Sequence, residues 1–238
     1  GHEYGALSPR AWWFVGGRPS ATNGWWKGAS GNWYYFAGRA SSVVSQWVYD
    51  GGQWYWMDAT GAMATGWIHD GKSWYYLDSA GHPSSSGWKW IDGAWYYLDA
   101  GRARTGWMFD RGQWYWLDSI NAKMATGWTQ VDGQWYYMGS SGAMATGWMS
   151  SGGTWYYLSG SGAMVTGWGR VSGSWYYFSA TGAMMTGWFQ DGSTSWYYAG
   201  SSGSMMTGWL NSGGAWYYLS SSGALATGWV LDSGAWYY

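Results

Sequence analysis

Aromatic rings are the side chains with the greatest capacity for chemistry in this sequence. Its 238 residues include 28 Trp and 22 Tyr, but only three His and no Cys. The histidines His2, His69 and His82 lie far apart in the sequence, without a repeated carboxylate or thiol partner. Acid–base, nucleophilic and metal chemistry need such groups in combination, so we expect no catalytic residues, no cofactor and no metal site. Aromatic faces instead indicate ligand binding, because they attract cations and pack on apolar groups.

The overall charge excludes two classes of partner. The chain has 11 basic and 12 acidic residues, so no basic surface is expected to hold nucleic acid. No run of about 20 apolar residues occurs, which predicts that the chain does not insert into a membrane. The absence of Cys also excludes a disulfide framework.

A repeat of about 20 residues organises the rings. One Trp, usually preceded by Thr-Gly, returns every 19 to 22 residues, and a Trp-Tyr-aromatic triplet follows it. The opening residues of the repeats are Trp25, Trp47, Trp67, Trp88, Trp107, Trp128, Trp148, Trp168, Trp188, Trp209 and Trp229. The sequence therefore predicts eleven repeats in residues 25–238, preceded by a degenerate first repeat or N-terminal cap in residues 1–24.

Each repeat has the pattern of a β-hairpin followed by a loop. Two short segments, 146–150 and 154–158, flank the glycine turn Ser151-Gly152-Gly153, and aromatic residues favour strands. Other repeats carry Asp-Gly, which we expect to form the turn; these pairs are Asp50-Gly51, Asp70-Gly71, Asp92-Gly93, Asp132-Gly133 and Asp191-Gly192. An isolated hairpin is marginally stable, so tandem hairpins must stack on their neighbours. The predicted fold is all-β, an elongated solenoid (superhelix) of tandem β-hairpins.

Stacked hairpins are expected to enclose an aromatic box at each junction. Strand alternation places the Trp and the first Tyr of a triplet on opposite faces, so the Trp face of one hairpin can meet the first Tyr of the next. We expect two Trp of one repeat, the first Tyr of the following repeat and a loop Met or Leu to share this aromatic box. An uncharged box of three rings suits a quaternary ammonium group. The alternative is that these rings form only the core of the solenoid.

The repeated motifs resemble a known family. The segment 142–148, Gly-Ala-Met-Ala-Thr-Gly-Trp, followed by Trp-Tyr-Tyr-Leu at 155–158, resembles the choline-binding repeat of Gram-positive surface and secreted proteins. The motif returns nearly unchanged in residues 61–77 and 162–178. The resemblance covers essentially the whole chain and is weakest before residue 25.

The resemblance implies a non-catalytic cell-wall-binding module. In this family, choline or phosphocholine on wall teichoic or lipoteichoic acid binds between consecutive repeats of a left-handed superhelix. The family pocket uses two Trp of one repeat, a Tyr of the next and often a Met. A secreted, wall-associated chain of this kind either anchors or targets another protein to the wall, or acts itself as an antibacterial wall-targeting factor.

Seven junctions carry the complete expected pattern. The predicted choline-binding sets are Trp47, Trp54, Tyr75 and Met63; Trp107, Trp114, Tyr136 and Met124; Trp128, Trp135, Tyr156 and Met144; Trp148, Trp155, Tyr176 and Met164; Trp168, Trp175, Tyr197 and Met184; Trp188, Trp196, Tyr217 and Met205; and Trp209, Trp216, Tyr237 and Leu225. The junctions led by Trp25, Trp67 and Trp88 are expected to be empty or weak, because the loops of these repeats lack the Met.

A related repeat offers a different function. Clostridial toxins and glucosyltransferases contain repeats of this kind that bind carbohydrate, a glucan or another glycan. Sugar sites usually add Asp, Asn, Gln or Lys to bind hydroxyl groups, whereas the polar residues here are mostly Ser and Gly. The sequence therefore favours choline and leaves carbohydrate, or a purely structural spacer, as alternatives.

Overall fold

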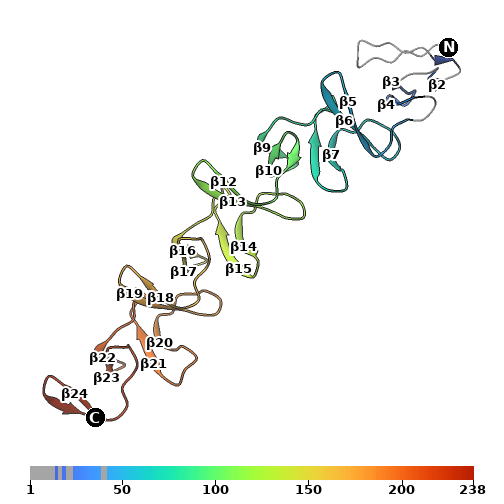
Figure 1. The fold of residues 1–238 in the computed structure, drawn as a ribbon. Coiled ribbons are helices and arrows are strands. Elements are labelled where there is room, and N and C mark those ends of the chain that lie inside the picture. Colours follow the sequence, from blue (N-terminus) through green and yellow to red (C-terminus); the bar gives the residue numbers. More distant parts are fainter. Residues whose placement is uncertain (1–13, 16–17, 20–23, 39–41) are drawn as a thin grey trace. The chain divides into compact units, whose positions relative to one another are not determined.

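The computed structural model describes residues 14–15, 18–19, 24–38 and 42–238 and separates the chain into two units, residues 1–125 and 126–238. Within the described residues every regular element is a β-strand, and Figure 1 shows the strands paired as hairpins linked by loops. This arrangement confirms the predicted all-β class of tandem hairpins. Of the predicted first repeat, only the pairing of Phe14–Val15 with Arg18–Pro19 falls within the described residues.

The first unit contains the short pair β1 and β2 and five longer hairpins. Its strands are β1 (Phe14–Val15), β2 (Arg18–Pro19), β3 (Gly24–Lys27), β4 (Trp33–Phe36), β5 (Gln46–Asp50), β6 (Gln53–Met57), β7 (Gly66–His69), β8 (Trp74–Leu77), β9 (Gly87–Ile91), β10 (Ala94–Asp99), β11 (Arg102–Ala103), β12 (Gly106–Asp110) and β13 (Gln113–Leu117). Strand β11 pairs with both β10 and β8, which joins two hairpins into a five-stranded sheet.

The second unit contains six hairpins. Its strands are β14 (Gly127–Val131), β15 (Gln134–Met138), β16 (Gly147–Ser151), β17 (Thr154–Leu158), β18 (Gly167–Val171), β19 (Ser174–Phe178), β20 (Gly187–Gln190), β21 (Trp196–Ala199), β22 (Gly208–Ser212), β23 (Ala215–Leu219), β24 (Val230–Asp232) and β25 (Ala235–Tyr237). Each hairpin forms its own two-stranded sheet.

In nine of the eleven longer hairpins, the residue that follows the aromatic triplet is buried at the centre of the repeat. In β17 this residue is Leu158, which is completely buried and pairs with Gly147 across the hairpin. Its counterparts are equally inaccessible; they are Met57, Leu77, Leu98, Leu117, Met138, Phe178, Ala199 and Leu219. One buried aliphatic or aromatic side chain per repeat thus supplies a small core beneath the exposed Trp residues.

The loop after each hairpin returns toward the preceding repeat. In the loop after β19, Met184 forms an antiparallel bridge with Phe178, and its N–H donates to the carbonyl oxygen of Trp155 at 2.8 Å. Trp155 belongs to the previous hairpin, β17, so the loop links two repeats through the backbone. Five further loop residues make the same bond to a triplet Trp; they are Met63, Met124, Met164, Met205 and Leu225.

The Asp-Gly pairs predicted as turns form two groups. Asp132 and Gly133 have φ values of +49° and +82°, as a type I′ turn requires, and Asp92 and Gly93 match them. At the other three pairs only the glycine has a positive φ, so the prediction was wrong for the aspartate. These pairs are Asp50-Gly51, Asp70-Gly71 and Asp191-Gly192.

The described residues lack two features that would indicate other functions. They contain no group of three or more His, Cys, Asp or Glu side chains able to hold a metal ion. Nor do they include a helix long and apolar enough to cross a membrane.

Candidate ligand-binding site

A complete aromatic box lies at the junction led by Trp148. The Trp148 ring centroid lies 6.4 Å from that of Trp155 and 4.8 Å from that of Tyr176 in the next hairpin, with steep interplanar angles of 83° and 70°. The rings enclose a cavity of about 360 Å³. The lining comprises Trp148, Trp155, Tyr176, Met184, Ser201 and Ser202. No charged side chain lines this cavity, and Trp155 remains 48% exposed at its mouth.

The next junction repeats this geometry. Trp168 lies 6.4 Å from Trp175 and 4.9 Å from Tyr197 between ring centroids. The cavity measures about 390 Å³ and is lined by Trp168, Trp175, Tyr197, Met205, Ser221 and Ser222. Three successive repeats therefore contribute to each box, because the two serines come from the loop that follows the third hairpin.

The first unit contains a smaller box led by Trp47. The centroids of Trp47 and Tyr75 are 4.9 Å apart. The cavity measures about 280 Å³, and its lining comprises Trp47, Trp54, Tyr75, Pro83 and Ala100. Pro83 occupies the position that Met184 and Met205 hold in the second unit.

The contact between an opening Trp and the first Tyr of the next repeat recurs at the other predicted sites. The centroid distances are 4.8 Å for Trp128 and Tyr156, 4.9 Å for Trp188 and Tyr217, and 4.8 Å for Trp209 and Tyr237. In the remaining set, Trp107 lies 6.4 Å from Trp114, whereas Tyr136 belongs to the other unit. That set stays a prediction.

The predicted Met residues were assigned one repeat too early. The cavity of Trp148 contains Met184 rather than Met164, the cavity of Trp168 contains Met205 rather than Met184, and that of Trp47 contains Pro83 rather than Met63. The reason is that the loop after a hairpin forms a backbone hydrogen bond with the preceding hairpin, rather than with the one that follows. The same backbone hydrogen bond joins Met63 to Trp33, Met164 to Trp135, and Leu225 to Trp196, so each of these loop residues lies at the junction of the preceding hairpin.

Assigning each loop residue to the preceding junction changes which junctions lack a Met. The Trp88 junction, expected to be weak, gains Met124, whose N–H donates to the carbonyl oxygen of Trp95 at 2.8 Å. The centroid of Trp88 lies 5.0 Å from that of Tyr115, and Trp95 is 41% exposed. This junction therefore has every element of an aromatic box.

The junction led by Trp25 is closed by its own side chains. Trp25 is 1% exposed and Tyr55 is 7% exposed, with their ring centroids 4.6 Å apart. His82 packs against Tyr55, and its Nε2 lies 3.0 Å from the Tyr55 hydroxyl oxygen. Burial, with smaller contributions from nearby aspartates, raises the pKa of Tyr55. Met63 bonds to Trp33 of this junction, but the opening Trp and the facing Tyr are buried and offer no accessible ring face to a ligand.

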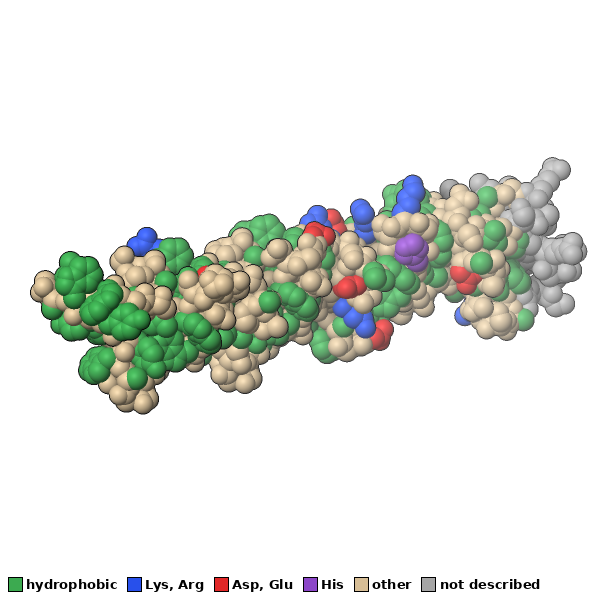
Figure 2. Space-filling model, turned by 90° about the horizontal axis from the view of Figure 1, so that it is seen from below, with side chains coloured by type: hydrophobic (Ala, Val, Ile, Leu, Met, Phe, Trp, Pro, Cys, Tyr) green, Lys and Arg blue, Asp and Glu red, His purple; other side chains and the backbone are tan. Residues whose placement is uncertain are grey.

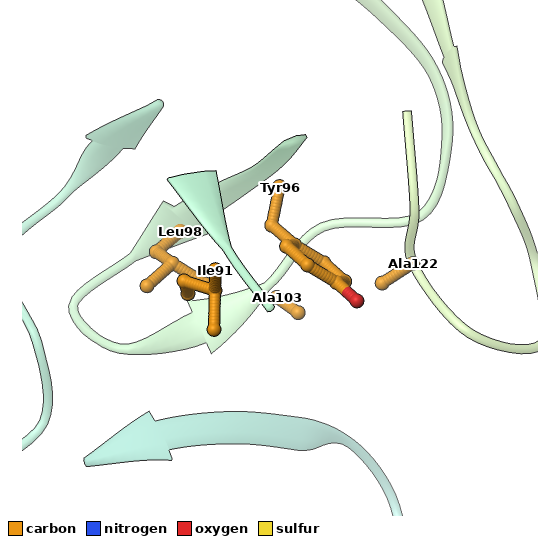
Figure 3. Close-up of a cluster of buried hydrophobic side chains, with 5 residues drawn as sticks. All are labelled: Ile91, Tyr96, Leu98, Ala103 and Ala122. Carbon is orange, nitrogen blue, oxygen red and sulfur yellow. The ribbon is translucent and has the colours of Figure 1, made fainter. Parts of the chain in front are cut away.

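The junction led by Trp67 is closed in a different way. Tyr96 lies 4.6 Å from Trp67 between ring centroids and is 5% exposed. Figure 3 shows its ring extending toward Ala122, with Ala103 beside it. Ala103 stands at the position of the Met, and Ala122 stands where most repeats have Gly.

A contact between Met and Gly explains this pair of alanines. Gly203 has a φ of +81°, and a Cβ added there would lie 2.3 Å from the Sδ of Met184. The loop glycine therefore makes room for the Met of the preceding loop. Ala122 adopts the same backbone conformation with a φ of +60°, and its methyl group is accommodated because Ala103 is small. The two positions thus change size together.

Aspartates at the hairpin ends accept hydrogen bonds from the opening Trp residues, a role that the sequence did not predict. Trp168 Nε1 donates a hydrogen bond to Asp191 Oδ2 in the next hairpin at 2.8 Å. Four further pairs make this bond: Trp25 and Asp50 at 3.2 Å, Trp47 and Asp70 at 3.4 Å, Trp88 and Asp110 at 3.0 Å, and Trp209 and Asp232 at 3.1 Å. The sequence signal is an Asp 22 to 25 residues after the opening Trp.

These hydrogen bonds favour the charged carboxylate. The Ser193 hydroxyl and the Trp168 indole hold the pKa of Asp191 below its ordinary value. At Asp70, partial burial opposes ionisation, but the backbone N–H groups of Ser73 and Lys72, together with the Trp47 indole, still lower the pKa. Some aromatic boxes therefore have a negative charge beside one Trp, although no carboxylate lines the cavity itself.

The described geometry defines a class of protein: tandem β-hairpin repeats with uncharged aromatic boxes at their junctions. Two family descriptions match the sequence. "Choline-binding repeat" matches residues 125–166, 165–208 and 206–238, and "Putative cell wall binding repeat" matches residues 45–63, 65–82, 86–101 and 105–119. The chain belongs to the choline-binding repeat family.

Solved structures of Streptococcus pneumoniae proteins share the fold. CbpJ is 33% identical, with a TM-score of 0.64, and the match covers 98% of this chain and 97% of CbpJ. Choline binding protein F is 32% identical, with a TM-score of 0.60 and coverage of 100% and 99%. The autolysin LytC is 28% identical, with a TM-score of 0.55, over 92% of this chain and 51% of LytC. A search of curated proteins found no match.

Proposed function

We propose that this chain is a non-catalytic cell-wall-binding module that binds the phosphocholine of teichoic or lipoteichoic acids. The observation that carries the proposal is the recurring aromatic box, shown most clearly by Trp148, Trp155, Tyr176 and Met184. Its three rings and thioether surround a cavity without a charged side chain. Such a cavity suits a cation that needs no hydrogen-bond acceptor.

The trimethylammonium group of choline meets this requirement. It cannot donate hydrogen bonds, and each ring face attracts it by roughly 0.5–2 kcal/mol. Figure 2 shows how few charged side chains lie on one face of the molecule, so the attraction is local to each box rather than long-range. A further observation comes from choline binding protein F, which has been crystallised in complex with ipratropium, a quaternary ammonium compound.

Several weak boxes together give durable attachment. A single box is expected to bind choline near the millimolar range, which corresponds to roughly 4 kcal/mol. Teichoic acid carries many choline groups on one flexible polymer, so after the first contact the next group arrives at an effective concentration on the order of millimolar. Each open box therefore multiplies the residence time on the wall. The chain would anchor or target a secreted protein to the wall, or act as an antibacterial wall-targeting factor.

Thermal unfolding distinguishes choline from sugar as the ligand of the boxes. Choline at millimolar concentration should raise the melting temperature of the full chain, because it binds only the folded junctions. Glucose oligomers at the same concentration should have a much smaller effect. A shift with the oligomers and none with choline would transfer the function to carbohydrate binding.

Retention on purified walls tests the biological partner. The full chain should be retained by walls that carry phosphocholine and released by free choline at high concentration, while moderate salt should leave it bound. Walls stripped of phosphocholine are the matched control. Equal retention on the two wall preparations would overturn the proposed partner even if free choline binds.

A further inference from the structure

A polar groove in the first unit differs from every aromatic box described above. It measures about 760 Å³, roughly twice the volume of the boxes led by Trp148 and Trp168. Its lining combines one exposed ring, Trp90, with charged and amide side chains such as Lys89, Asp92 and Gln53. This volume lies within the usual range of small-molecule sites.

The ring of Trp90 gives the groove a flat, accessible apolar surface. Trp90 is 60% exposed and lies opposite Trp95 in the hairpin β9–β10, with the ring centroids 5.5 Å apart at 62°. The edge contact with Trp95 supports the Trp90 ring while much of its surface remains open to solvent. Aromatic faces of this kind pack against the C–H groups of sugar rings, since both surfaces are flat and apolar.

Polar groups around the ring are already held by neighbouring side chains. Lys89 Nζ donates to Ser85 Oγ at 2.8 Å, which keeps the ammonium group beside the groove. His82 also lines the groove; its Nδ1 lies 3.7 Å from Asp78 Oδ2, and its Nε2 lies 3.0 Å from the Tyr55 hydroxyl oxygen. Donors and acceptors are thus both present, and the two signs of charge are mixed. A neutral ligand with many hydroxyl groups matches this lining better than a simple anion or cation does.

The repeat pattern gives an independent reason to regard the groove as a site. Two loops read Gly-Ala-Met-Ala-Thr-Gly and five others differ from it at one or two positions, but residues 81–87 read Gly-His-Pro-Ser-Ser-Ser-Gly. Four of the residues that differ, from His82 to Ser85, line the groove. The hairpin position of Trp90 is occupied by Gln130, Ser150, Arg170, Gln190, Asn211 and Leu231 in the second unit, none of them aromatic. Hairpins fold without these substitutions, so folding alone does not require them.

We propose that this groove is a carbohydrate-binding site that takes a short oligosaccharide of pyranose rings. Trp90 supplies the stacking surface, and Gln53, Lys89 and Asp92 bind hydroxyl groups. The groove shares Pro83 with the aromatic box led by Trp47, but none of the rings that line the boxes of Trp47, Trp148 and Trp168 line the groove, so its ligand contacts are separate from those of choline.

The test is isothermal titration calorimetry of the full chain with chitotetraose and, separately, maltotetraose. Saturating choline is present throughout, so the boxes do not contribute. One of the two tetrasaccharides should bind at a single site. Trp90→Gln, which introduces the residue found at position 130, should weaken that binding about tenfold or more. Phe109→Gln is the matched control, because Phe109 is 57% exposed at the equivalent position of the next hairpin but lies outside the groove.

A second variant guards against a folding defect in the first. Gln53→Ala changes an exposed side chain from a different hairpin, β5–β6, and should weaken the same binding severalfold while the melting temperature stays unchanged. The proposal is overturned if neither tetrasaccharide binds at millimolar concentration. It is also overturned if Trp90→Gln and Phe109→Gln bind equally well. Failure of choline to bind in a separate titration would affect the aromatic boxes and leave this result intact.

Discussion

The two units share one hairpin scaffold but differ in how strictly they keep the repeat. In the second unit the loops preserve the Gly-Ala-Met pattern with small changes, and the cavities of Trp148 and Trp168 have nearly the same lining. In the first unit the Met position holds Ser42, Met63, Pro83, Ala103 and Met124 in turn. The corresponding junctions range from open at Trp47 to closed at Trp25 and Trp67.

The two units also differ in their number of charged residues. The second unit contains only four charged side chains, Asp132, Arg170, Asp191 and Asp232. The remaining charged residues belong to the first unit, including those that line the polar groove. The backbone bond from a loop residue to the triplet Trp of the preceding hairpin occurs in both units, at Met63 and Met124 in the first and at Met164, Met184, Met205 and Leu225 in the second, although Pro83 has no N–H with which to make it. Loops and strand faces can therefore change while the hairpins persist, because both units keep the paired strands and the buried core residues.

Removing one box Trp should give the largest effect and separate an open junction from a closed one. Trp155→Ala should abolish one choline site and lower the free energy of unfolding by about 2 kcal/mol, less than for a fully buried Trp because half of its surface is exposed. The matched change Trp74→Ala, at the closed Trp67 junction, should leave the number of choline sites unchanged. Calorimetry measures both stoichiometries. Loss of a site in Trp74→Ala would show that the Trp67 junction is open.

Transferring the alanine pair from the first unit tests why the Trp67 junction is closed. Gly203→Ala should lower the free energy of unfolding by about 1–2 kcal/mol, since the new methyl group displaces Met184 and the backbone has a positive φ. Adding Met184→Ala should recover roughly 0.5–1 kcal/mol by recreating the pair formed by Ala103 and Ala122. Urea unfolding of the two single variants and the double variant gives the coupling energy. Strict additivity would contradict the proposed contact.

Restoring a Met should make one box of the first unit resemble those of the second. Pro83→Met places a thioether beside Trp47 and Tyr75, and Gly101 leaves room for it because it has no Cβ. We expect choline to bind that box about two- to fivefold more tightly, which corresponds to roughly 0.4–1 kcal/mol. A global fit of calorimetric titrations of the parent and variant chains measures the change. Weaker binding would mean that Pro83 packs against choline better than a Met at this position does.

Removing the Asp191 carboxylate, which accepts the hydrogen bond of the Trp168 indole, should give the smallest effect on stability, and this effect should depend on pH. The pKa of Asp191 is lower in the folded chain than its ordinary value of about 3.9, so the charged form contributes stability above that value. The contribution is lost as the pH falls through the lower, folded pKa. Asp191→Asn should therefore be slightly less stable than the parent from pH 8 to 5, with the difference shrinking below about pH 4. A difference that grows toward acid would contradict this sign.

Much of the scaffold could be predicted from the sequence. The spacing of the opening Trp residues indicated the repeats, and alternation within Trp-Tyr-Tyr-Leu indicated that the first Tyr faces the preceding hairpin. The structure has this contact at Trp148 and Tyr176 and at its counterparts. Local strand geometry decides these features, so a local pattern is sufficient to find them.

The loops could not be predicted in the same way. Met164 was placed beside Trp148 because the two are close in sequence, whereas backbone bonding carries each loop to the hairpin before its own. The bond from Trp168 to Asp191 spans 23 residues and was hidden by the turn preference of Asp-Gly. His82, which packs against Tyr55 of the closed Trp25 junction, lies more than two repeats after Trp25 in the sequence. Each of these contacts depends on the stacking of repeats rather than on a single repeat.

The central claim is that the aromatic boxes bind a cation through their ring faces. Parallel calorimetric titrations of the full chain with choline and with 3,3-dimethylbutan-1-ol test it most directly. The alcohol has the same shape, but carbon replaces the charged nitrogen. Choline should bind about tenfold or more tightly than the alcohol, a difference of about 1.4 kcal/mol. Equal affinity for the two compounds would show that the boxes are hydrophobic pockets without preference for a cation.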